Sequence, residues 1–183
     1  MSMMRQLFRP GAGARHERFI QAIATNTDMY RGDYVVWDTA ATPTAITLGG
    51  VTLGANDFIF ANTKATSIAG EQAGIIVGGD GTTGSIRNTD TTTAVCTATT
   101  GSLVIIQTWG VFDTHANTVS AVAASDKVLV VGGTVAGEMT DLTVVGTDSP
   151  QSLIALTLST SATYTRGTVT TNTGVTCFVR CDF

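Results

Sequence analysis

Short apolar runs separated by turn residues dominate this sequence from Tyr30 to its end. Turn signals rich in Gly, Asp, Asn and Ser recur about every 8–12 residues, a spacing typical of sandwiches and barrels. Thr supplies 34 of the 183 residues and Gly 20. Threonine and valine favour the pleated, half-buried surface of a strand, and glycine favours turns. The pattern predicts an all-β fold, a compact β-sandwich or β-barrel of about nine to eleven short strands.

The longest apolar run, residues 103–112, predicts a central strand that is apolar on both faces at its start, so both faces must be covered. The Gly49-Gly50 pair predicts a two-residue hairpin turn within residues 45–53. The polar stretch 78–100 is either an exposed loop or a threonine-rich hairpin. Other predicted strands are 34–37, 57–60, 74–77, 119–122, 128–131, 142–145, 153–158 and 175–180.

The N-terminal segment differs from the rest in charge, which divides the chain into a basic arm, residues 1–29, and a β-rich domain, residues 30–183. Residues 1–31 hold five arginines against Glu17 and Asp28, a net +3, whereas the chain as a whole carries −4. A basic arm on an acidic body indicates either an acidic partner surface or a solvated leader. Apolar residues within 14–24 fit a short helix, and an extended arm fits equally well.

Charge and hydropathy exclude several classes of function. A net charge of −4 and a pI near 4.9 argue against binding nucleic acid through phosphates. No run reaches the roughly 18–20 apolar residues of a membrane span. The N-terminus lacks the apolar region of a signal peptide, so we expect synthesis and folding in a cytoplasm. Cys177 and Cys181 lie too far apart along an extended strand for a disulfide, and their spacing is not a zinc motif, which predicts free, largely buried thiols.

No recognisable catalytic motif is present, so we expect no enzymatic activity and no cofactor. His115 follows Asp113 in what the pattern predicts as the loop after the long strand, and no nucleophile elbow or paired glutamate accompanies it. The glycine-rich stretch 78–84 lacks the lysine of a phosphate-binding loop. The Arg31-Gly32-Asp33 tripeptide matches an adhesion motif, but it leads into a strand as an ordinary turn would.

Three stretches carry a resemblance to a known family. Residues 102–111 (SLVIIQTWGV) end in a Q-x-x-G pattern, residues 122–130 (VAASDKVLV) form a turn into a strand, and residues 136–139 (AGEM) follow. Together with the strand entry at 30–37, these stretches resemble small structural proteins of tailed bacteriophages. The resemblance covers about residues 30–140, with Ser125 standing where that family commonly has glycine.

The resemblance implies a capsid decoration, or cement, protein. Such proteins are compact β-folds, commonly homotrimers, that bind the exterior of the mature virion head and fasten its capsomers. Their N-terminal arms commonly contact the major capsid protein. On this interpretation the candidate capsid contacts are Arg5, Phe8, Arg9, Arg15 and Arg18. The candidate oligomer interface holds Trp37, Trp109 and Phe112.

Three alternatives remain at this stage. The chain is a different virion subunit, from a tail or a fibre. It is a carbohydrate-binding β-module that stacks sugars on Trp37 or Trp109 beside the polar stretch 78–100. The last alternative is a hydrolase that uses His115 with an aspartate.

Overall fold

A computed structural model describes residues 17–24, 28–37, 46–48, 51–53, 60–62, 72–79, 91–92, 94–95, 103–123, 127–131, 137–141 and 153–181. Within these residues all regular structure is strand, so the all-β prediction is confirmed. The strands are β1 (Arg18–Ala24), β2 (Tyr34–Trp37), β3 (Ile46–Leu48), β4 (Val51–Leu53), β5 (Phe60–Asn62), β6 (Gln72–Gly79), β7 (Leu103–Thr118), β8 (Val128–Val131), β9 (Met139–Asp141), β10 (Leu153–Thr157), β11 (Ala162–Arg166) and β12 (Val169–Arg180).

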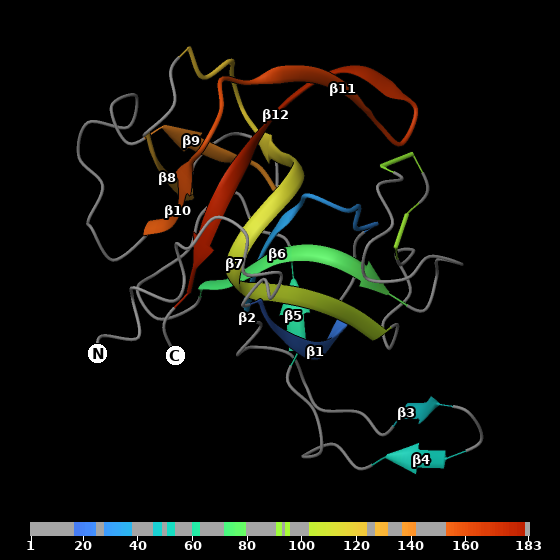
Figure 1. Cartoon of the computed structure of the whole chain (residues 1–183). Coiled ribbons are helices and arrows are strands. Elements are labelled where there is room, and N and C mark those ends of the chain that lie inside the picture. Colours follow the sequence, from blue (N-terminus) through green and yellow to red (C-terminus); the bar gives the residue numbers. More distant parts are fainter. Residues whose placement is uncertain are drawn as a thin grey trace, which may run out of the picture.

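Five strands close a barrel in the order β1-β5-β2-β6-β7, because β7 also pairs with β1 (Figure 1). The β1–β5 pairing is parallel and the other four are antiparallel. The first core is formed by side chains from β1, β2, β6 and β7 of this ring, joined by two residues from connecting segments. Its buried members are Ala22, Met29, Val35, Ala73, Ile76, Val95, Val104 and Ile106.

A second ring of pairings runs β7-β9-β8-β10-β12 and returns to β7, with β11 on the far side of β12. It closes through a single parallel pair, Thr118↔Met139. Its buried side chains form the second core, which also takes the residues of β2 and β6 that alternate with those of the first core. Examples are Tyr34, Ile75, Phe112, Leu129, Ala155, Cys177 and Val179. The two rings are therefore packed together through one continuous set of apolar contacts.

Strand β7 belongs to both rings. Its first half pairs with β1 and β6, and its second half pairs with β12. The strand predicted at 103–112 is confirmed and extends to Thr118. His115 consequently lies within β7 and not in a loop after it, so its predicted loop placement is wrong. The sequence did not predict the polar end of this strand, DTHANT, because the strand that pairs with it, β12, lies far away in the sequence.

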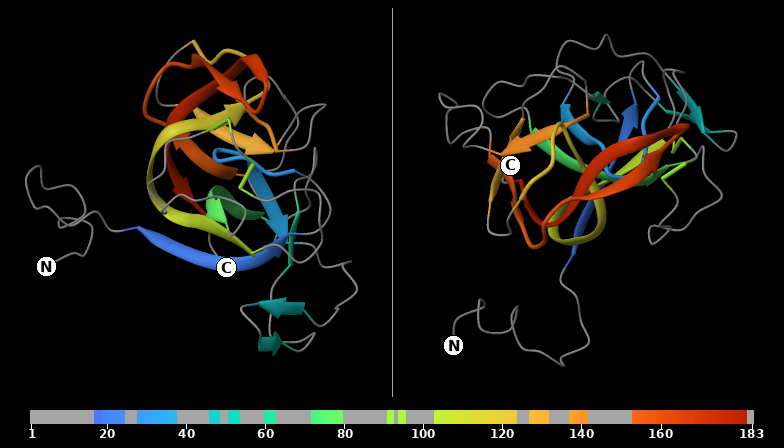
Figure 2. Two further views of the ribbon diagram at one scale, coloured as in Figure 1. Left: turned by 90° about the vertical axis from the view of Figure 1, so that its right-hand side faces the viewer. Right: turned by 90° about the horizontal axis from the view of Figure 1, so that it is seen from above.

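The N-terminal residues 18–24 form a strand, so the extended alternative holds there and the helical one is wrong. Six residues of β1 pair with β7, from Arg18↔Trp109 to Ile23↔Leu103. The segment predicted as an arm thus contributes one strand to the barrel. Figure 2 shows β1 at the opposite end of the molecule from the β11–β12 hairpin.

Other predictions are resolved locally. The hairpin predicted at 45–53 is confirmed as β3 and β4, with Leu48 paired to Val51. Residues 119–122 lack strand geometry, and the strand predicted at 142–145 lies outside the described residues. Cys177 and Cys181 are buried and are not joined in a disulfide, as predicted. In the described part of the chain, no helix is long and apolar enough to cross a membrane.

Candidate functional site

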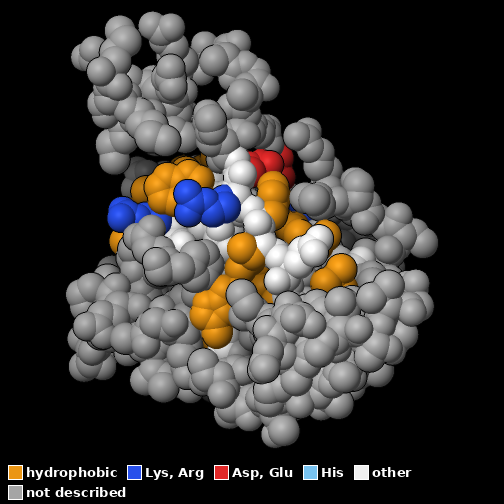
Figure 3. All heavy atoms as spheres, turned by 90° about the horizontal axis from the view of Figure 1, so that it is seen from below, with side chains coloured by type: hydrophobic (Ala, Val, Ile, Leu, Met, Phe, Trp, Pro, Cys, Tyr) orange, Lys and Arg blue, Asp and Glu red, His pale blue; other side chains and the backbone are white. Residues whose placement is uncertain are grey.

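A tryptophan between two arginines marks the outer surface where the two rings meet. In the paired strands, Trp109 of β7 lies opposite Arg18 of β1 on one side and Arg180 of β12 on the other. Residues paired in this way project from the same face of a sheet. Both arginines are exposed, and the partly exposed Trp109 ring meets the Phe178 ring edge-on, with centroids 5.1 Å apart. From below, basic side chains lie against hydrophobic ones (Figure 3).

A second row of side chains, entirely apolar, lies beside the first. Val111 of β7 pairs with Phe178 of β12, and Phe178 pairs with Leu156 of β10. Val111 is 36% exposed, Leu156 41%, and Leu158, two residues further, 44%. Their neighbours along each strand point into the second core, so the exposed row is the outer side of the same sheet. We call Arg18, Trp109, Val111, Leu156, Leu158, Phe178 and Arg180 together the arginine–tryptophan face.

Two of the residues singled out from the sequence, Arg18 and Trp109, are paired on this face although they are far apart in the sequence. Trp37 lies at the end of β2 and packs against the first core. Phe112 is 1% exposed and belongs to the second core. Its side chain is therefore not on the surface through which this structure could contact another subunit. The candidate contacts Arg5, Phe8, Arg9 and Arg15 lie outside the described residues.

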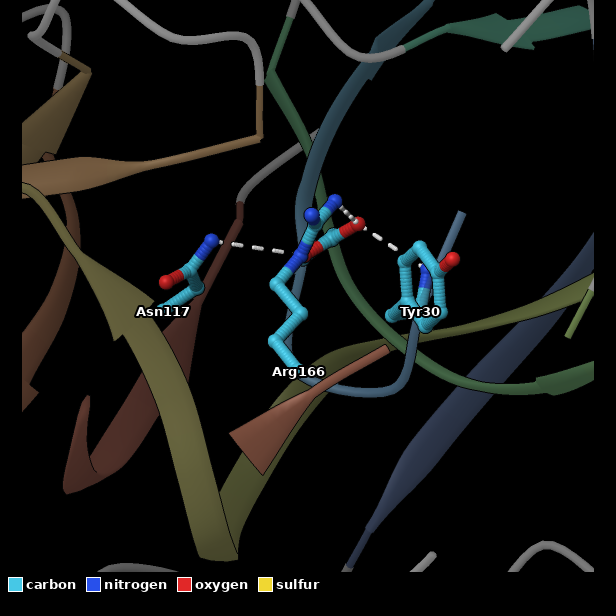
Figure 4. A network of polar contacts seen from close by, with 4 residues as sticks. Tyr30, Asn117 and Arg166 are labelled. Atoms are coloured by element: carbon cyan, nitrogen blue, oxygen red, sulfur yellow. Dashed lines mark hydrogen bonds and ion pairs between the residues drawn. The ribbon is translucent and has the colours of Figure 1, made fainter. Parts of the chain in front are cut away.

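Beneath the surface, the Arg31-Gly32-Asp33 tripeptide forms a buried turn that joins the two rings. Asp33 is 0% exposed, and its carboxylate accepts hydrogen bonds from Arg166 Nε at 2.7 Å and Nη2 at 2.6 Å. The Tyr30 amide donates to it at 2.9 Å and Asn117 Nδ2 at 3.4 Å (Figure 4). The Arg166 guanidinium also lies 4.5 Å from the centroid of the Tyr30 ring. Four donors thus surround one buried carboxylate.

Arg31 and Gly32 extend this turn toward the first ring. The Arg31 guanidinium donates to the Val77 carbonyl at 2.6 Å and to Thr114 Oγ1 at 3.2 Å, and it lies 5.3 Å from the Phe112 ring centroid. Gly32 has φ +97°, and a Cβ there would lie 2.1 Å from the His115 carbonyl oxygen. Only glycine fits such an approach. With both charged side chains buried, this turn does not present an adhesion motif.

Burial and charge pairing act in opposite directions on the ionisable groups around this turn. Burial raises the pKa of Asp33 and lowers the pKa of Arg31, and the hydrogen bonds and charge of Arg166 oppose the shift of Asp33. Burial lowers the pKa of Arg166, but its hydrogen bonds and charge interaction with Asp33 outweigh that effect, so the pKa is raised. Burial raises the pKa of Tyr164, and the charge of Asp33 raises it further. Burial also raises the pKa of Glu138, an effect that Arg166 opposes and Asp33 reinforces. The contact between Asp33 and Arg166 is therefore a buried ion pair with a structural role.

His115 lies beside this network and serves packing in the structure. Its ring stacks on Tyr164 with centroids 4.8 Å apart and planes inclined by 15°. Asp33 is enclosed and already engaged by Arg166, so it is not presented to a substrate. Among the residues that the structure describes, no group of three or more His, Cys, Asp or Glu side chains is placed to hold a metal ion.

Sequence reasoning missed most of the residues that complete both features. Phe178, Arg180 and Leu156 belong to predicted strands, but nothing local shows which face of each strand is exposed. Arg166 lies 133 residues from Asp33, and Asn117 lies 84 residues from it. The one available signal was Asp33 itself, a charged residue directly before an apolar strand, which requires a partner if it is buried.

Comparisons with known proteins identified no similar protein. A scan against protein-family models, a search of curated proteins and a search of solved structures each found no match.

Proposed function

We propose that this chain is a virion structural protein, a capsid decoration protein that binds the outer surface of a phage head. The observation that carries the proposal is the arginine–tryptophan face at the start of β1. Residues 1–16, which include Arg5, Arg9 and Arg15, precede Glu17 and Arg18 in the sequence. The basic segment therefore directly precedes, in the sequence, the strand that carries Arg18 of this face.

Physical arguments support a binding role of this kind. A ligand that binds only the assembled lattice stabilises it by mass action, and no chemistry is needed. The two rings share strand β7, and a buried ion pair links Asp33, directly before β2, to Arg166 of β11. Many copies on one lattice, or several in a homotrimer, multiply weak contacts through effective concentration. The major capsid protein is the proposed partner.

The experiment is co-sedimentation of the full-length chain with empty, mature capsids assembled from the major capsid protein of its own virus. We expect saturable binding, and a higher temperature of capsid disruption when the chain is bound. A deletion of residues 1–16 should weaken binding while leaving the body folded. The deletion must stop there because β1 begins at Arg18 and belongs to the barrel. Absence of wild-type binding to intact capsids would refute the proposed function.

A carbohydrate-binding module is the second candidate, favoured by the partial exposure of Trp109. Sugars stack on the flat face of an aromatic ring. The rings of Trp109 and Phe178 make an edge-to-face contact, with their planes inclined by 80°. A glycan array with the wild-type chain and Trp109→Ala separates the two candidates. Glycan binding that is lost in Trp109→Ala, with no capsid binding, would establish the second candidate in place of the first.

A further inference from the structure

The arginine–tryptophan face combines an exposed apolar row with two exposed arginines. Its apolar row crosses three adjacent strands, from Val111 through Phe178 to Leu156. Its cationic row places Arg18 and Arg180 on either side of Trp109. Tryptophan and arginine are the residues most enriched where binding energy concentrates in protein interfaces. Contiguous exposed apolar side chains with a polar rim mark interaction sites.

The charge of the face identifies the chemistry of its occupant. The chain carries −4 overall, yet the two charged residues that flank Trp109 are both arginines, whereas the exposed Asp113 lies beyond Val111 on the same side of β7. Arginine pairs with carboxylates through two parallel hydrogen bonds. A second copy of this acidic chain that met the face through its own arginine–tryptophan face would bring like charges together. A nucleic acid would satisfy the arginines, but its phosphates would leave the Val111–Leu156 row without apolar cover.

We infer that the arginine–tryptophan face is the docking surface for a protein segment that carries both apolar side chains and carboxylates. The inference rests on the proposed function, within which that segment belongs to the major capsid protein. The apolar side chains of the partner cover Val111, Phe178 and Leu156 and exclude water. Its carboxylates bind Arg18 and Arg180, and Trp109 lies between the two kinds of contact.

The test uses the full chain with Trp37→Phe, which leaves Trp109 as the single tryptophan because the sequence has only two. Trp109 fluorescence is titrated with three synthetic peptides of equal length. One alternates leucine and glutamate, one serine and glutamate, and one leucine and lysine. We expect the leucine–glutamate peptide to shift the emission and the other two to bind at least tenfold more weakly, because each lacks one of the two contacts. Equal binding of all three, or none, would overturn the inference.

Matched variants locate the site. Arg180→Gln and Val169→Glu change the net charge by the same amount, but Val169 is 52% exposed on β12 near the β11–β12 turn, away from the face. Val111→Lys and Val169→Lys form a second such pair. We expect about tenfold weaker binding of the leucine–glutamate peptide by the two face variants and no change for the two Val169 variants. Circular dichroism and the thermal midpoint of each variant separate lost binding from lost folding.

Two further outcomes decide between occupants. Light scattering of the wild-type chain and Val111→Lys tests the second copy: a wild-type oligomer that Val111→Lys dissociates would replace the proposed occupant. Binding of single-stranded oligonucleotides as tight as that of the leucine–glutamate peptide would likewise overturn it. Capsid co-sedimentation of the same variants keeps the two proposals distinct. Peptide binding without capsid binding refutes only the proposed function, and capsid binding unchanged by Arg180→Gln and Val111→Lys refutes only the docking surface.

Discussion

The substitution Asp33→Asn tests whether the buried ion pair joins the two rings. It removes the charge while keeping the size of the side chain. The Arg166 guanidinium then lies in a largely buried position without a carboxylate, and two hydrogen bonds of 2.6–2.7 Å lose their ionised acceptor. Removing one partner of a buried ion pair costs about 3–5 kcal/mol. For a chain of this length each kcal/mol shifts the thermal midpoint by about 2–4 °C, which gives a decrease of about 6–20 °C.

The assay is urea and thermal unfolding followed by circular dichroism, with a surface ion pair as the control. Lys127 and Asp141 lie 3.6 Å apart on a more exposed part of the second ring. Lys127→Ala should therefore cost no more than about 1 kcal/mol. The double variant Asp33→Asn with Arg166→Met removes both charges and should recover part of the loss. A loss for Asp33→Asn no larger than that for Lys127→Ala would refute the reasoning.

Four further predictions follow from individual contacts. Gly32→Ala should lower the free energy of unfolding by more than about 1 kcal/mol, measured in urea, because its positive φ and the His115 carbonyl leave no room for a Cβ. Because burial raises the pKa of Glu138 above 4.5, its contribution to stability is present below 4.5 and is lost as the pH rises through the folded-state value. Glu138→Gln should abolish this component of the pH dependence, as seen in urea midpoints from pH 4 to 7. Burial raises the pKa of the Cys177 thiol, so iodoacetamide should alkylate it only after unfolding, as mass spectrometry of its peptide would reveal. A deletion of residues 1–16 should leave the thermal midpoint within a few degrees of wild type, whereas a deletion of residues 1–24 should abolish cooperative unfolding because it removes β1 from the barrel.

The local pattern predicted the elements of this fold well, because strand formation depends on short-range alternation and turn chemistry. The hairpin at residues 45–53 and the long strand beginning at residue 103 follow from glycine pairs and apolar runs alone. Residues 14–24 were ambiguous because their apolar spacing fits a helix and an extended segment equally well. Pairing with β7 decides the matter for residues 18–24, since the edge of a neighbouring strand satisfies their backbone hydrogen bonds.

In the candidate site, too, the local sequence predicted some features and the pairing of distant strands determined the others. Arg18 was a candidate capsid contact through the resemblance and its place in the basic segment, and Trp109 was a candidate oligomer contact because it stands in an apolar run. The sequence did not place them together, nor add Phe178, Arg180 and Leu156 to them. Those neighbours depend on the register of β7 with β1 and of β12 with β7 and β10. A shift of one residue would exchange the exposed and buried faces of a strand.

What the sequence by itself determined is the class of fold and the chemical character of its parts: an all-β body, low in charge, preceded by a basic segment. Only the tertiary structure decided that β7 is shared by two rings and that Asp33 binds Arg166 across 133 residues. It also decided that Phe112 is core while Val111, its neighbour, is surface. The physical reason is that propensity and periodicity act over a few residues, whereas strand register, burial and charge pairing are settled by contacts between segments distant in the chain.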